Sequence, residues 1–204
     1  MADSVVTFES AARSFAGLVR RIPDDGWAGP GLGDWDLRSL VGHASRSLIT
    51  VSTYLQTPAE REDVTTPQEY YAHIADYMSN AGAEAITERG RQAGRDLGDD
   101  PVQTIDELID RVRGELATAG NPLIAVIGGL GIRLHTYLVT RIFELAVHSL
   151  DIARAADLSF DLPGEVLDEA TVLAARVAVL SGRGGELLMS LTGRTALPPG
   201  FSVV

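Results

Sequence analysis

The segment RIFELAVHSLD, residues 141–151, carries the residues best suited to chemistry. On a helix, with about 100° of rotation per residue, Glu144 and His148 lie one turn apart on one face, and Asp151 follows one turn later. Arg141 lies one turn before Glu144 on the same stripe. Because burying such groups without partners costs free energy, we expect them to be paired, solvated in a cleft or bound to a metal. A carboxylate and an imidazole at this spacing can converge on one cation.

A Glu-x-x-x-His pair is weak evidence by itself, since such pairs also form ordinary surface interactions on helices. His43 is the histidine that strengthens the metal hypothesis. Its neighbours one turn away, Ser39 and Ser47, are small and polar, and apolar residues around them supply packing. The alternative for a lone histidine in such a place is a hydrogen-bonded residue of the core.

The other two histidines are weaker candidates. His135 precedes Glu144 by nine positions, which places it near the opposite face of the same helix. His73 is flanked by tyrosines and is expected on a partly exposed surface. We predict structural roles for both.

Several amphipathic segments must position these residues. Apolar spacings of three and four, capping residues and glycine or proline breaks predict helices over residues 4–22, 39–55 after an N-cap at Asp34 or Asp36, 67–92, around 97–120 with Gly120 at the end, 131–156 and 164–180. After residue 182, the segments ELLMSLTGR and FSVV have strand-like lengths. The prediction is an all-α bundle over residues 1–182 with at least one crossover connection, and a short extended tail over residues 183–204 packed against it.

Composition excludes several classes of protein. The chain has 204 residues with 28 acidic and 17 basic side chains, so its formal net charge of −11 argues against a nucleic-acid partner. It has no cysteine, which excludes disulfides, zinc fingers, iron–sulfur clusters and a cysteine nucleophile. Any metal must therefore be held by histidine nitrogen and carboxylate oxygen. With no secretory signal visible and no apolar stretch of membrane length, we expect a cytoplasmic protein without membrane contact.

Three segments together resemble a known family. GPGLGDWDLRSLVGHAS resembles the early motif of the mycothiol-dependent maleylpyruvate isomerase-like family, within the DinB-like superfamily. RIFELAVHSLDIARA resembles its second motif, in which a Glu and a His one turn apart complete the metal site. The closing LTGRTALPPGFSVV is similar to the end of shorter members. The likeness spans the chain from about Trp27 to the C-terminus.

This resemblance implies a DinB-like four-helix bundle with additional helices and a metal site whose ligands come from different helices. The residues that match the family's ligands are His43, Glu144 and His148. Three such ligands leave coordination positions open for water or a thiolate, and Zn²⁺ is the expected ion. Asp151 is then a candidate to orient a ligand imidazole. Arg141 could attract an anionic substrate or pair with a carboxylate, and we favour the pairing.

The resemblance further implies an enzyme that uses a low-molecular-weight thiol, mycothiol, for isomerisation or S-transfer on a small electrophile. Two other functions stay open: a non-catalytic metal- or ligand-binding bundle, and metal-dependent hydrolysis without thiol. Full-length isomerases of this group carry a larger C-terminal domain with a functional arginine, with which neither Arg183 nor Arg194 aligns. The resemblance therefore implies thiol chemistry more directly than isomerisation of maleylpyruvate. The electrophile, the physiological metal and a possible homodimer are not determined by the sequence.

Overall fold

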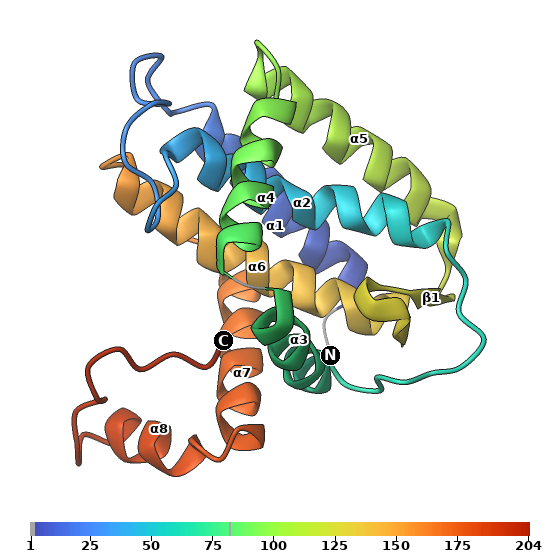
Figure 1. Cartoon of the computed structure of the whole chain (residues 1–204), viewed down its shortest axis with the longest axis vertical. Coiled ribbons are helices and arrows are strands. Elements are labelled where there is room, and N and C mark those ends of the chain that lie inside the picture. The colour runs from blue at the N-terminus through green and yellow to red at the C-terminus, as the bar shows by residue number, and fades with distance from the viewer. Residues whose placement is uncertain (1–2, 82) are drawn as a thin grey trace.

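A computed structural model describes residues 3–81 and 83–204 and is mostly helical (Figure 1). The elements in chain order are α1 (Ser4–Val19), α2 (Leu37–Leu55), α3 (Pro67–Ala81), α4 (Ala83–Asp96), α5 (Pro101–Ala119), β1 (Leu123–Ala125), the short 3-10 helix η1 (Ile127–Gly129), β2 (Gly131–Arg133), α6 (Leu134–Ala155), α7 (Gly164–Leu180) and α8 (Gly184–Leu191). The predicted all-α class is confirmed.

Helices α1, α2, α5 and α6 form the four-helix bundle, in which α1 and α2 each contact both α5 and α6. Large apolar side chains from all four helices fill its centre and are at most 1% exposed: Phe8, Phe15, Leu48, Ile105 and Ile142. Burial of each such side chain contributes about 1.5–3 kcal/mol to folding. This packing holds α2 and α6, the two helices with the candidate metal ligands, against each other.

Aspartate side chains start three of the helices as N-caps. Asp3 accepts a hydrogen bond from the backbone N–H of Val5 at 3.0 Å, and Asp100 accepts one from Gln103 at 2.9 Å. Of the two predicted caps for α2, the structure selects Asp36, which accepts from Ser39 at 2.7 Å. These bonds satisfy N–H groups that have no partner within the helix.

The predicted helix over residues 67–92 is two helices, α3 and α4, which together connect α2 to α5. Helix α4 packs against α2, whereas α3 packs against α6 and α7. Because the two halves bury their apolar faces on different neighbours, one straight helix could not serve both contacts. This long connection carries several residues of the site described below.

The apolar stretch around residues 121–134 forms a small hairpin, whose second strand takes residues 131–133 from the predicted long helix. Strand β1 pairs antiparallel with β2, with Ile124 opposite Ile132 and both side chains buried. Gly128 and Gly129 turn the chain with φ values of 72° and 76°, a left-handed conformation that favours glycine. Helix α6 therefore begins only at Leu134. Within the described ranges, no helix combines the length and apolarity needed to cross a membrane.

The strand-like prediction for ELLMSLTGR is wrong, because α8 occupies most of this segment. A strand needs an edge to pair with, and the β1–β2 hairpin lies on the far side of the molecule (Figure 1). Helix α8 instead packs on α7. The residues after α8 have no regular secondary structure; the guanidinium of Arg183 lies 4.0 Å from the ring centre of Phe201, and Val203 packs against the core.

Candidate metal centre

His43 lies in the first half of α2, where this helix is held very close to α4. A Cβ atom on Gly42 would lie 2.3 Å from the backbone nitrogen of Gly94, so only glycine permits this approach. The ring centre of His43 lies 4.5 Å from that of Trp35. Trp35 is fixed in turn, because its indole N–H donates to the carbonyl oxygen of Thr87 at 2.8 Å. The direction of the His43 side chain is therefore set by α4 as well as by its own helix.

Glu144 and His148 lie one turn apart on α6 and face His43 across the α2–α6 contact. Oε2 of Glu144 is 3.4 Å from Nε2 of His148, and the rings of His148 and His43 are 4.9 Å apart and nearly perpendicular. One ligand atom from each of the three residues lies within 4.8 Å of the other two. Atoms bound to one tetrahedral metal at about 2.1 Å are about 3.4 Å apart, so this spacing is close to that of a ligand set.

Two further side chains direct the donor atoms of this cluster. Oδ2 of Asp151 lies 3.2 Å from Nδ1 of His148, and this contact leaves Nε2 facing Glu144. The Tyr71 hydroxyl donates to Oε1 of Glu144 at 2.9 Å, and Oε2 remains on the side of the histidines. Such outer hydrogen bonds fix the orientation of metal ligands in many proteins. Asp151 thus contacts the imidazole of a candidate ligand, and its role in orienting that ligand stays a prediction.

The electrostatics favour ionised Glu144 and neutral His43. Burial and the nearby charge of His148 lower the pKa of His43 to about 4, so its imidazole is neutral and has a free lone pair at neutral pH. Burial opposes ionisation of Glu144, but the hydrogen bond from His148 and the charge of Arg141 outweigh it and hold its pKa at about 2. Burial likewise opposes protonation of His148, yet its bonds to Asp151 and Glu144 raise its pKa to about 9.

The donor set therefore fits a divalent cation. Two imidazoles and one carboxylate are the nitrogen and oxygen ligands that Zn²⁺ and related ions accept in catalytic sites, where three protein ligands leave a position open. His148 lies between the carboxylates of Glu144 and Asp151. A bound dication would supply the positive charge that a proton on His148 supplies there without metal.

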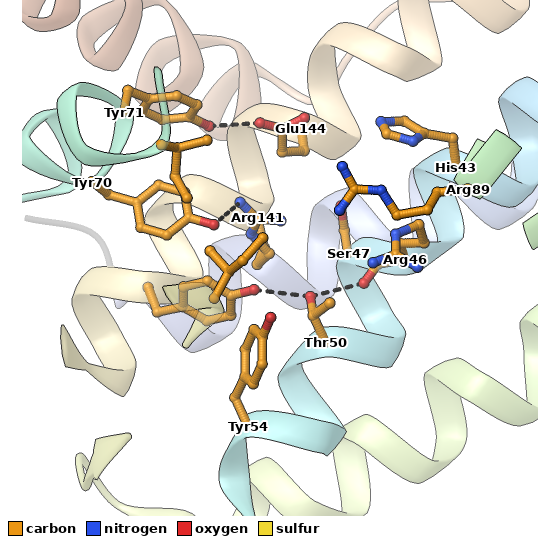
Figure 2. Close-up of a pocket in the computed structure, with 13 residues that line it drawn as sticks. His43, Arg46, Ser47, Thr50, Tyr54, Tyr70, Tyr71, Arg89, Arg141 and Glu144 are labelled. Atoms are coloured by element: carbon orange, nitrogen blue, oxygen red, sulfur yellow. Dashed lines mark hydrogen bonds between the residues drawn. The ribbon is translucent and has the colours of Figure 1, made fainter. Parts of the chain in front are cut away.

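A cavity of about 180 Å³ adjoins the cluster (Figure 2). His43 and Glu144 line one end of it, and Thr50 and Tyr54 lie at the other end. Helices α2, α3, α4 and α6 and the segment η1 contribute its walls, whose polar residues include Arg46, Ser47, Tyr70, Tyr71, Arg89, Tyr137 and Arg141. A small molecule in this cavity would lie directly beside the candidate ligands.

Arg141 does not make the predicted ion pair with any described carboxylate. Its Nε donates to the Thr140 hydroxyl at 3.1 Å, and its Nη2 lies 3.4 Å from the Tyr70 hydroxyl. Its guanidinium also lies over the rings of Tyr137 and Tyr70, at 4.8 and 5.4 Å from their centres. Tyrosines from α3 and α6 thus surround the group, and its charge acts on the Glu144 carboxylate without a direct ion pair. The role of Arg141 stays a prediction.

The two remaining histidines lie outside the cluster. His73 is exposed on α3, and His135 is half-buried at the start of α6, where its backbone N–H donates to Oδ1 of Asn121 at 2.9 Å. Neither belongs to the group of residues that could hold an ion.

The sequence analysis did not single out Trp35, Tyr71, Arg46 and Arg89, which belong to the site. Trp35 lies in the GDWD segment ahead of α2, and Tyr71 is the second residue of a tyrosine pair that is separated from His73 by one alanine. No pattern marks the two arginines, because they lie on separate helices, α2 and α4, and only packing brings them to one cavity.

The fold and the cluster define a four-helix bundle with a candidate two-histidine, one-carboxylate centre between two of its helices. The model of the mycothiol maleylpyruvate isomerase N-terminal domain family matches residues 8–153, and the chain belongs to this family. The matched range includes His43, Glu144 and His148 and ends within α6. Comparison with curated proteins and with solved structures gives no match.

Proposed function

We propose that this protein is a metal-dependent enzyme that uses a low-molecular-weight thiol, mycothiol, for isomerisation or S-transfer on a small electrophile. His43, Glu144 and His148 are the proposed ligands of one divalent cation, with Zn²⁺ as the ion that best suits the donors. The observation that carries the proposal is the convergence of two imidazoles and one carboxylate, with ligand atoms within 4.8 Å of one another, beside a cavity. The description of the family, which names mycothiol and an isomerase, supports the choice of thiol.

The metal ligands, the residues that orient them and the cavity have separate roles in the proposed reaction. A divalent cation at the three ligands would lower the pKa of a thiol and so supply a thiolate near neutral pH. Asp151 holds the His148 ring so that Nε2 is the free donor, and Tyr71 holds Glu144 so that Oε2 is free. The adjoining cavity confines the electrophile next to the thiol, and this proximity lowers the entropic part of the barrier.

Metal analysis of protein purified without a histidine tag tests the ligand set. We expect about one equivalent of a divalent metal, and less than about a tenth of an equivalent after exposure to zinc would contradict the proposal. His148→Ala should abolish metal retention while the helical circular dichroism signal is kept. His135→Ala is the matched control, because it removes a histidine from the same helix outside the cluster, and it should retain the metal.

Activity measurements separate the proposed function from its alternatives. Zinc-loaded protein with mycothiol and a panel of electrophiles should give thiol-dependent conjugates or isomers. Turnover that is independent of added thiol would instead indicate metal-dependent hydrolysis. Metal binding without any turnover over the whole panel would indicate a non-catalytic binding protein.

A further inference from the structure

The cavity beside the candidate metal centre is cationic, although the protein as a whole is strongly acidic. The chain carries a formal net charge of −11, yet among the described residues that line the cavity the charged side chains are those of Arg46, Arg89, Arg141 and Glu144. Arg89 also has an interaction of its own, so the inference depends on Arg141. A local excess of positive charge within low-dielectric walls attracts anions. Such a concentration of arginines in an acidic protein points to an anionic ligand.

Arg141 is the arginine of this cavity whose contacts leave room for a further acceptor. It forms no ion pair with any carboxylate among the side chains that the structure describes, and its hydrogen bonds use only Nε and Nη2. Nη1 donates to none of these side chains. The charge of the Glu144 carboxylate, one turn away, acts on Arg141 without a direct ion pair. A buried arginine is costly unless its charge and its donors are satisfied, so a guanidinium beside a cavity with a donor left over can take an anion from that cavity.

The surroundings of Arg141 hold its guanidinium in one orientation. The Tyr70 and Tyr137 rings, whose centres are 5.8 Å apart and tilted by 70°, form two walls against which it lies. Tyr137 is itself fixed, because its hydroxyl donates to the Thr50 hydroxyl at 2.9 Å. A guanidinium held in this way loses little conformational freedom when a planar anion binds.

The distance to the candidate metal centre suits a small bifunctional molecule. Arg141 and Glu144 lie one turn apart on α6, where side chains start about 5–6 Å from each other, and both line a cavity of about 180 Å³. One end of a small molecule can therefore contact Arg141 while its other end lies near His43.

We propose that Arg141 is a specificity-determining residue that binds a carboxylate carried by one of the two reactants. The chemical class follows from the planar fork of the guanidinium, which matches the two oxygens of a carboxylate. This inference rests on the proposed function for the identity of the reactants, but the anion site itself requires no metal.

Calorimetric titration with succinate, and with its neutral diamide succinamide, tests the site. Wild-type protein should bind succinate and bind succinamide at least about tenfold more weakly, because only the dicarboxylate offers a charged partner to Arg141. Arg141→Gln should weaken succinate binding by about ten- to a hundredfold. Arg183→Gln is the matched control, since Arg183 also lies over an aromatic ring but far from the cavity, and it should bind as the wild type does.

Two further measurements test the anion site if Arg141→Gln folds poorly. Arg141→Lys keeps the charge but loses the fork, so it should bind succinate with intermediate affinity. In the wild type, succinate should shift the Nε–H resonance of Arg141 in a nitrogen-15 NMR titration. Succinate affinity that is unchanged in both variants, or equal affinity for the diamide, would overturn the proposal.

Two comparisons distinguish failure of the anion site from failure of the proposed function and identify the reactant that carries the carboxylate. The titrations are run on metal-free and on zinc-loaded protein: Arg141-dependent binding in a protein that takes up no zinc would support the anion site and defeat the metal chemistry. Competition with N-acetylcysteine and with its neutral amide then locates the carboxylate. Displacement of succinate by the carboxylated thiol alone assigns the anion to the thiol, whereas simultaneous binding of succinate and either thiol assigns it to the electrophile.

Discussion

The hydroxyl of Tyr71 on α3 donates a hydrogen bond of 2.9 Å to Oε1 of Glu144 on α6. Burial and the neighbouring Glu144 carboxylate raise the pKa of Tyr71 well above its usual value, so this hydroxyl keeps its proton. One oxygen of Glu144 is thereby occupied and the other faces the histidines. Helix α3, which carries no candidate ligand, thus controls how the carboxylate is presented.

Tyr71→Phe should weaken zinc affinity by about tenfold, because Glu144 loses the bond that orients it. The free energy of unfolding should also fall by about 1–3 kcal/mol, since a buried carboxylate oxygen loses its donor. Competition with a chromophoric chelator and chemical denaturation measure the two effects. Tyr137→Phe is the matched control, because it removes the buried hydroxyl that donates to Thr50, away from the candidate ligands. It should lose about 1 kcal/mol of stability and keep its zinc affinity.

Asp151→Asn should lower zinc affinity about ten- to a hundredfold, because the neutral amide supports the imidazole of His148 less strongly than the carboxylate does. Asp168→Asn is the control, since Asp168 is exposed on α7 and is not part of the cluster. Equal zinc affinity for both variants would show that Asp151 does not support a metal ligand.

Zinc binding at pH 7 should release about one proton. His148, whose pKa is raised to about 9, is protonated in the metal-free protein at this pH and must lose its proton to bind a cation. His43, with a pKa near 4, and Glu144, with a pKa near 2, are already deprotonated and release none. Apparent affinity should therefore rise about tenfold per pH unit from pH 6 towards 9 and level off above it. Calorimetry in two buffers of different ionisation enthalpy measures this release, and its absence at pH 7 would contradict the role of His148.

Gly42→Ala should destabilise the protein by about 1–3 kcal/mol and weaken zinc affinity. The added methyl group would lie 2.3 Å from the backbone of Gly94, so α2 and α4 must separate and His43 must move with α2. Gly17→Ala is the matched control within α1, where a methyl group meets nothing within 4 Å. This control should be neutral or stabilising by up to about 1 kcal/mol, as measured by thermal and chemical denaturation.

Local patterns in the sequence were sufficient for the helices and for the polar stripe of α6. The spacing of apolar residues and the cap signals at Asp34 or Asp36 and at Gly120 predicted α2 and α5 closely, because helix formation depends on neighbours within about one turn. The one-turn relation of Glu144 and His148 is equally local and needs only a helix. The small polar neighbours of His43 made it a candidate and the resemblance to the family matched it to a ligand, but no local rule connects it to α6.

Tertiary packing alone decided the rest. The meeting of His43 with Glu144 and His148 requires α2 to lie against α6, and the supports from Tyr71 and Trp35 come from segments whose position depends on contacts distant in the sequence. The same holds for the surroundings of Arg141, which include a tyrosine brought in by α3, and for the hairpin and α8, where short apolar segments fit either a strand or a helix. Periodicity determines which face of an element is apolar, but the partner of that face is selected by the packing of the whole chain.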